Sequence, residues 1–228
     1  MLIQRTQLAL FTQFFFQDYQ QDLVRHFGEH YPQQTLLLGV PGLLQAIQNG
    51  CTQAERHGFE TKRDLCLYTH LTFMLGIGFD SDPQLEWAQE ILQDPLLVDS
   101  RSRMHDLWEQ AMIYMERVVG PKGIHPQHVL QTVQRRDMAR DRVSQAQDED
   151  VLLSFFQEVW PEKASYVGTT ALRVLISQNR RAAAGHGIVD GPGREEFALH
   201  AFLFGHRFHV DPLYSWDRFM IKAVHPRP

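Results

Sequence analysis

The sequence carries one stretch twice, and this repeat limits what the chain can fold into more than any other feature. Shifting the sequence by 129 positions aligns residues 22–87 with residues 151–216 without a gap. The alignment holds 16 identities in 66 pairs, whereas ordinary residue frequencies give roughly four. Many identities are Gly, Pro, His or Trp, which chance similarity between two amphipathic helices does not produce. We therefore predict a tandem duplication of one structural unit.

The repeated residues mark the ends and corners of helices. Pro32 stops a helix because its ring removes a backbone donor and clashes with the preceding turn. Glycine readily adopts the left-handed backbone conformation that is common just after a helix ends. Asp followed by Pro is favoured at the start of a helix, where Asp caps free N–H groups and Pro occupies the first turn. Each unit is therefore predicted to hold about four helices. The predicted corner residues are Gly58, Gly76, Phe79, Asp82, Pro83 and Trp87 in the first copy and Gly187, Gly205, Phe208, Asp211, Pro212 and Trp216 in the second.

Strands are not expected, because no stretch alternates polar and apolar residues with period two over a useful length. The predicted fold class is all-α: a tandem duplication of a roughly four-helix unit joined by a two-helix middle segment. The middle helices are predicted at residues 100–119 and 128–145. We expect an N-terminal unit over residues 1–95, a connector over 96–150 and a C-terminal unit over 151–228, within one compact globule.

The charge and the cysteine content exclude two classes of protein. A formal net charge of -5 and a pI near 6.2 leave no basic face for nucleic acid. Cys51 and Cys66 are too few for a disulfide framework, which favours a reduced, cytoplasmic setting. The apolar run near the N-terminus is interrupted by Gln13 and Gln17. It is far shorter than the roughly 20 apolar residues of a membrane span, so no membrane insertion is expected.

Histidines near the last corner of the second copy, around Gly205 to Pro212, are the best candidates for a metal site. His200, His206 and His209 lie close to Asp211 in the sequence, and imidazole and carboxylate groups are suitable ligands for zinc or iron. The first copy carries no histidine at any matching position, and a chain with 12 histidines places some together by chance. We therefore expect structural or solvent-exposed histidines, with no metal and no cofactor.

No catalytic signature is evident in the sequence. Cys66 lies in an apolar helix, where burial raises the pKa of a thiol and makes it a poor nucleophile. Asp80 and Asp82 resemble an acid–base pair, but the second copy keeps only Asp211. No serine lies in a Gly-x-Ser-x-Gly elbow. We therefore predict that the protein is not an enzyme.

Residues 63–83 of the first copy, together with a few residues upstream, form a distinctive pattern. The residues run Arg-Asp-Leu-Cys-Leu-Tyr at 63–68 and Phe-Met-Leu-Gly-Ile-Gly-Phe-Asp-Ser-Asp-Pro at 73–83, with Tyr31-Pro32 and Gly39 upstream. This pattern resembles a family of all-helical bacterial proteins encoded beside type VI secretion genes, next to spike, effector and effector-loading adaptor genes. The resemblance covers residues 10–95, whereas the second copy matches only as a diverged repeat without the Asp-x-Cys-x-Tyr segment. It carries over no catalytic residue and implies an accessory role inside the producing cell.

These observations favour a binding protein. The leading hypothesis is a non-enzymatic accessory protein of a type VI secretion system, a chaperone or co-adaptor that binds an effector or its loading adaptor in the bacterial cytoplasm. One alternative is an immunity protein that neutralises a cognate toxic effector, and a second is a metal-dependent enzyme that uses the histidine cluster. We expect a monomer or weak dimer. The candidate partner contacts are Phe11, Phe14, Phe15, Arg135, Arg136, Arg140 and Arg142.

Overall fold

The computed structural model describes residues 19–126, 128–129, 132, 149–189 and 191–213. Within these ranges the chain is helical, with turns and short connections and no strand, which confirms the predicted all-α class. The chain divides into two compact units: unit 1 comprises residues 1–74 with 209–228, and unit 2 comprises residues 75–208. None of the helices in this described part has the length and apolar character needed to cross a membrane.

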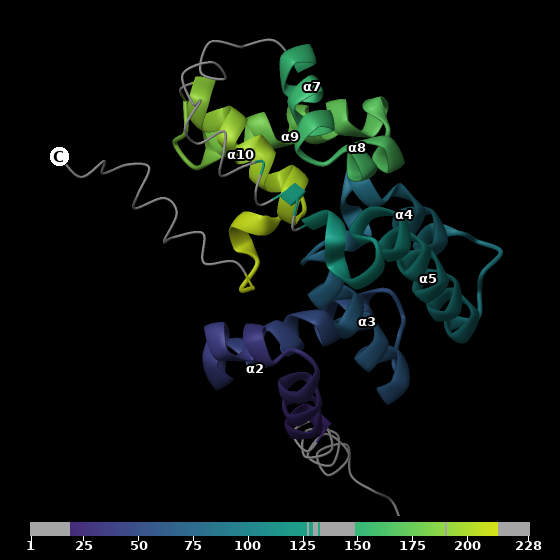
Figure 1. The fold of residues 1–228 in the computed structure, drawn as a ribbon. Helices are drawn as coiled ribbons and strands as arrows, with labels where there is room; N and C mark the ends of the chain where they lie inside the picture. Colours follow the sequence, from purple (N-terminus) through teal and green to yellow (C-terminus); the bar gives the residue numbers. More distant parts are fainter. Residues whose placement is uncertain (1–18, 127, 130–131, 133–148, 190, 214–228) are drawn as a thin grey trace, which may run out of the picture. The chain divides into compact units, whose positions relative to one another are not determined.

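Unit 1 is built from three consecutive helical stretches (Figure 1). The first covers residues 19–30, and it is followed by α2 (Pro32–Arg56) and α3 (Lys62–Leu75). α2 is bent at Gly39, whose φ of 64° and ψ of 172° are a conformation that residues with a Cβ rarely adopt. Leu43, Ile47, Cys51 and Ala54 are spaced by three or four residues and are buried, so the second half of α2 forms part of the core of unit 1.

Aromatic rings and one close helix crossing form the core of unit 1. The Phe27 side chain is fully buried, and its ring centroid lies 4.7 Å from that of Phe73. α2 and α3 approach each other closely at Gly50, where an added Cβ would lie 2.9 Å from Thr69 Oγ1 and 3.2 Å from Thr69 Cα. This crossing requires a glycine, because a larger residue fits only if the backbone of one helix shifts.

Unit 2 holds the remaining helices (Figure 1). In it α9 and α10 lie side by side, and the buried rings of Phe156 and Phe202 stack with their centroids 4.3 Å apart. In chain order the elements are η1 (Phe79–Ser81), η2 (Pro83–Leu85), α4 (Glu86–Gln93), α5 (Ser100–Tyr114), the π-helical turn η3 (Met115–Val119), η4 (Pro121–Gly123), α7 (Glu149–Val159), α8 (Pro161–Val167), α9 (Thr169–Gly185) and α10 (Gly191–Phe204). The short η6 (Phe208–Val210) follows at the boundary between the two units.

The first middle helix has the predicted bounds. The helix expected at residues 100–119 is observed as α5 continued by η3, and it ends before Gly120. Asp99 caps its start, because its carboxylate accepts a hydrogen bond from the Ser102 N–H at 2.9 Å. The second middle helix, expected over residues 128–145, lies mostly outside the described residues.

Most of the predicted corner residues lie at the ends of helical elements. Asp82 accepts a hydrogen bond from the backbone N–H two residues later at 2.9 Å, and Asp211 does the same at 2.8 Å. Pro83 is the first residue of η2, as expected for a proline after a capping aspartate. The corner glycines all have positive φ, with 78° at Gly58, 95° at Gly76, 78° at Gly187 and 99° at Gly205. The corner aromatic residues Phe79 and Phe208 are buried, whereas Trp216 lies outside the described residues.

The compact units divide the chain at other positions than the three-part division predicted from the sequence. The predicted boundaries near residues 95 and 150 follow the repeat, whereas the compact units divide after residues 74 and 208. The corner of the first copy belongs to unit 2 for a physical reason. Gln84 donates a hydrogen bond to the Ala201 carbonyl oxygen, and Asp82 accepts one from the His206 N–H.

Candidate functional site

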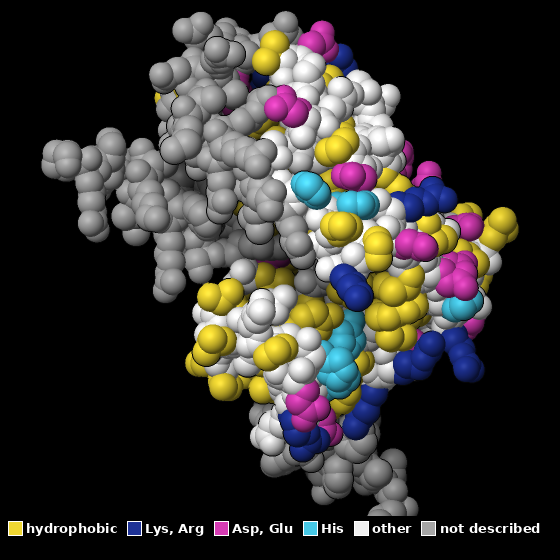
Figure 2. Space-filling view, in the orientation of Figure 1, with side chains coloured by type: hydrophobic (Ala, Val, Ile, Leu, Met, Phe, Trp, Pro, Cys, Tyr) yellow, Lys and Arg dark blue, Asp and Glu magenta, His cyan; other side chains and the backbone are white. Residues whose placement is uncertain are grey.

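The partner contacts predicted from the sequence, Phe11, Phe14, Phe15, Arg135, Arg136, Arg140 and Arg142, lie outside the described residues. Within the described part, exposed apolar side chains gather at the bend of α2. Leu36, Leu37 and Val40 are 86%, 78% and 64% exposed, and Figure 2 shows hydrophobic side chains along this helix. These three residues are named the α2 apolar surface below.

One of the three corresponding positions in unit 2 contacts a neighbouring helix, whereas Ser165 and Thr169, which align with Leu36 and Val40, are exposed. α8 aligns with the first half of α2 and lies against η3 and the end of α5. Trp160 Nε1 donates a hydrogen bond to the Val118 carbonyl oxygen at 3.0 Å. The ring centroids of Tyr114 and Tyr166 are 5.2 Å apart, and Tyr166 aligns with Leu37. The same position therefore contacts a neighbouring helix in unit 2 and is exposed to solvent in unit 1.

A second feature of unit 1 is a group of metal-ligating side chains on two helices. His26 and His30 are one turn apart on the first helix, and Cys66 and His70 are one turn apart on α3. One ligand atom from each of His26, Cys66 and His70 lies within 4.8 Å of the others, and this is the only such group among the described residues. Figure 2 shows histidine side chains gathered on this face of unit 1. Burial raises the pKa of the Cys66 thiol, as predicted.

Hydrogen bonds and ring stacking orient the histidines of this group. His26 Nε2 lies 2.8 Å from His70 Nε2, and the Tyr31 hydroxyl lies 2.9 Å from His70 Nδ1. The Phe27 ring stacks on the His70 ring with a centroid distance of 4.4 Å. Burial, together with the neighbouring His26 and His30, lowers the pKa of His70 to about 4. His70 is therefore neutral at neutral pH, which is the form that binds metal ions.

The three histidines predicted as metal candidates from the sequence, His200, His206 and His209, do not belong to this group. His200 Nδ1 lies 2.7 Å from the carbonyl oxygen of Glu196, and His206 lies beside Asp82 in unit 2. His209 falls in unit 1 by the division of the chain. His200 and His206 thus have structural neighbours. The sequence reasoning missed the converging group, although both of its residue pairs are spaced by four positions, which places them on one face of a helix.

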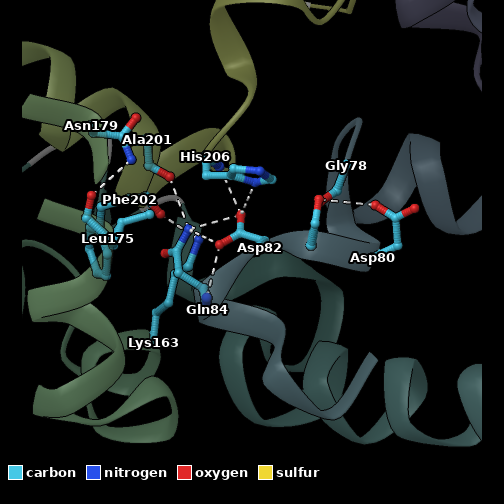
Figure 3. A network of polar contacts seen from close by, with 11 residues as sticks. Gly78, Asp80, Asp82, Gln84, Lys163, Leu175, Asn179, Ala201, Phe202 and His206 are labelled. Atoms are coloured by element: carbon cyan, nitrogen blue, oxygen red, sulfur yellow. Dashed lines mark hydrogen bonds and ion pairs between the residues drawn. The ribbon is translucent and has the colours of Figure 1, made fainter. Parts of the chain in front are cut away.

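A buried polar network centred on Asp82 lies in unit 2 (Figure 3). Asp82 is 3% exposed, and its carboxylate accepts hydrogen bonds from the backbone N–H groups of Gln84, at 2.9 Å, and His206, at 2.8 Å. Burial raises the pKa of Asp82, but the His206 ring and these N–H groups outweigh burial and hold the pKa below its usual range. The carboxylate is occupied by structural bonds, so we assign it no acid–base role.

Lys163 is a buried cation that the sequence pattern does not reveal. It is 5% exposed, and its ammonium donates a hydrogen bond to the Phe202 carbonyl oxygen. Nζ also lies 5.1 Å from the centroid of the Trp160 ring. Burial lowers the pKa of Lys163 to about 8, although the attraction of Asp82 raises it. These contacts assign the ammonium a structural role, because they use one of its donors and its charge within the core of unit 2.

Comparison with known proteins adds no family to this description. No protein-family model matches the chain, and no curated protein or solved structure matches it either.

Proposed function

We propose that the chain is a non-enzymatic accessory protein of a bacterial type VI secretion system, which binds an effector or its loading adaptor inside the producing cell. The resemblance of residues 10–95 to proteins encoded beside such genes supports the choice of system. The α2 apolar surface carries the binding role. Leu36, Leu37 and Val40 expose apolar side chains together at one bend of a helix, and exposed apolar clusters commonly mark sites for a protein partner.

The partner segment that suits this surface is an amphipathic helix. In unit 2 the aligned helix α8 is covered by α5 and η3, whose Tyr114 and Val118 are buried. A partner helix laid on the first half of α2 would bury its own apolar stripe against Leu36 and Leu37, which is a recurring mode of peptide recognition. We expect this helix to belong to the effector or to its adaptor.

The two copies differ at one position of this face: Leu37 is exposed in unit 1, whereas the aligned Tyr166 contacts Tyr114 of α5 in unit 2. Local geometry supports the duplication, because the kinks and helix ends of the two copies share their backbone conformations. Gly39 has φ 64° and ψ 172°, and the aligned Gly168 has φ 81° and ψ 156°. After each left-handed glycine, the next N–H bonds back to an aligned alanine at 3.0 Å, from Phe59 to Ala54 and from Ile188 to Ala183.

Co-purification with the products of neighbouring genes tests the proposed function. Each effector, adaptor and spike protein is co-expressed with the tagged chain, and the affinity of any complex is measured by calorimetry. We expect a stoichiometric complex that is weakened about 100-fold or more in the Leu36→Glu/Leu37→Glu variant, since central interface residues contribute about 2 kcal/mol each. The matched control is Leu96→Glu/Val98→Glu, which changes side chains that are 87% and 84% exposed and should keep the wild-type affinity.

The possible outcomes test the proposed function and the proposed binding surface separately. A chain that binds none of these products contradicts the proposed function. Equal weakening by both double variants contradicts only the assignment of the α2 apolar surface. A cell-survival assay distinguishes the immunity alternative, because an immunity protein protects a cell that makes the toxin, whereas a loading helper does not need to.

A further inference from the structure

Two helices of unit 1 each bring a pair of metal-ligating residues to one place. His26 and His30 are spaced by four residues on the first helix, and Cys66 and His70 are spaced by four on α3. Residues with this spacing lie on the same face of a helix. We propose that His26, Cys66 and His70 bind one zinc ion, which is a site separate from the α2 apolar surface.

The distances between the ligand atoms suit a tetrahedral zinc ion. The ligand atoms of His26, Cys66 and His70 lie within 4.8 Å of one another, and the two histidine Nε2 atoms are 2.8 Å apart. Zinc–nitrogen bonds of about 2.0–2.1 Å in a tetrahedral site separate two nitrogen ligands by about 3.3 Å. The ion therefore fits if the two rings move apart by about half an ångström.

The ligand types select the metal. Two imidazoles and one thiolate suit zinc, whereas magnesium and calcium prefer oxygen ligands. The Cys66 thiol loses its proton to solvent when the sulfur coordinates the ion, because a bound divalent cation favours the thiolate. All three side chains are partly exposed, so an ion can reach them from solvent.

Neighbouring side chains prepare the group for a metal ion. In the tautomer that leaves the His70 Nε2 lone pair for a metal ion, His70 Nδ1–H donates a hydrogen bond to the Tyr31 oxygen, and such second contacts are usual for ligating histidines. His30 Nδ1 lies 2.8 Å from the His26 carbonyl oxygen, which can only accept, so the His30 proton is on Nδ1. His30 is not among the residues whose ligand atoms lie within 4.8 Å of one another, so we expect a water molecule as the fourth ligand.

The second copy has no histidine at the positions of His26, His30 and His70. Phe155, Val159 and Leu199 stand at the positions aligned with His26, His30 and His70. Phe155 and Val159 are buried in the core of unit 2. A histidine group at positions where apolar residues suffice indicates a role beyond packing.

Metal analysis of the full chain tests the proposal. The protein is purified without chelators or a metal-affinity tag, and its zinc content and its affinity in competition with a chromophoric chelator are measured. We expect one zinc per chain, and a thiolate-to-metal charge-transfer band when cobalt replaces zinc. Cys66→Ser should remove that band and raise the Kd for zinc by about 100-fold or more, the upper range for losing even an outer contact. Cys51→Ser is the matched control, because Cys51 contacts Thr69 and lies outside the group.

Three further variants keep the test decisive. His26→Phe and His70→Leu install the aligned residues of the second copy, so they should abolish zinc binding while circular dichroism stays unchanged. Tyr31→Phe should raise the Kd about tenfold, because it removes only the bond that orients His70. Substoichiometric zinc in the wild-type chain overturns the proposal, as does equal affinity in the Cys66→Ser and Cys51→Ser variants. If a histidine variant does not fold, the cysteine pair still decides the outcome.

Discussion

Replacing Lys163 tests whether unit 2 holds a charge in its core. The ammonium is 5% exposed, bonds to the Phe202 carbonyl oxygen and lies over the Trp160 ring. Burial of the charge lowers the pKa of Lys163 from 10.5 to about 8. Lys163→Met keeps most of the side-chain volume and removes the titrating group, so the difference in stability between the two proteins isolates the contribution of this one ammonium.

The pKa values fix the sign and the size of the pH dependence. Because the pKa of Lys163 is lower in the folded chain, the unfolded chain binds more protons between about pH 8 and pH 10.5, and the stability that Lys163 contributes rises with pH through that window. Well below pH 8 Lys163 is protonated in both the folded and the unfolded chain. Burial of its charge then lowers the unfolding free energy by about 3 kcal/mol. Between pH 7.5 and pH 9.5 the recovered part is about 2 kcal/mol.

Urea unfolding followed by tryptophan fluorescence at both pH values measures this difference. The unfolding free energy of the wild type minus that of Lys163→Met should increase by about 2 kcal/mol from pH 7.5 to pH 9.5. Lys122→Met removes an exposed lysine of the same unit and should show no such change relative to the wild type. Parallel stability curves for the wild type and Lys163→Met would refute the reasoning, because they would mean that Lys163 titrates normally in the folded chain.

Two further substitutions test the packing of each unit by thermal or urea unfolding. Gly50→Ala should destabilise unit 1 by about 1–3 kcal/mol, because the added Cβ would lie 2.9 Å from Thr69 Oγ1. Gly28→Ala is its control, since a Cβ there meets no atom within 4 Å and should stabilise the helix by about 0.5–1 kcal/mol; equal effects of the two would contradict the close crossing. Asp82→Ala should destabilise unit 2 by about 2–4 kcal/mol, because it leaves the buried Gln84 N–H and the part-buried His206 N–H without this acceptor, and a loss below 1 kcal/mol would contradict the network.

The corners were predictable from the sequence because their causes are local. A glycine with positive φ, as at Gly58 and Gly76, or an aspartate before proline, as at Asp82, acts within a few residues of the backbone. Lys163 was not predictable, because a lysine near the start of a helix is usually exposed and only the tertiary packing of unit 2 buries it. The same holds for the zinc ligands. The spacing of Cys66 and His70 is visible in the sequence, but their meeting with the first helix depends on how the helices pack.

Tyr31 links the two features proposed for unit 1. Its hydroxyl contacts His70 in the proposed zinc site, and Tyr31 is also the residue directly before the first turn of α2. That turn leads directly to Leu36 and Leu37, so an ion that fixes His70 and Tyr31 also restrains the start of the partner-binding helix. Ordering this segment in advance reduces the entropy that the partner must overcome. Zinc is therefore expected to strengthen partner binding, and by thermodynamic reciprocity the partner should strengthen zinc binding by the same factor. Tyr31→Phe should reduce this coupling, and equal coupling in the wild type and the variant would show that the two sites communicate by another route.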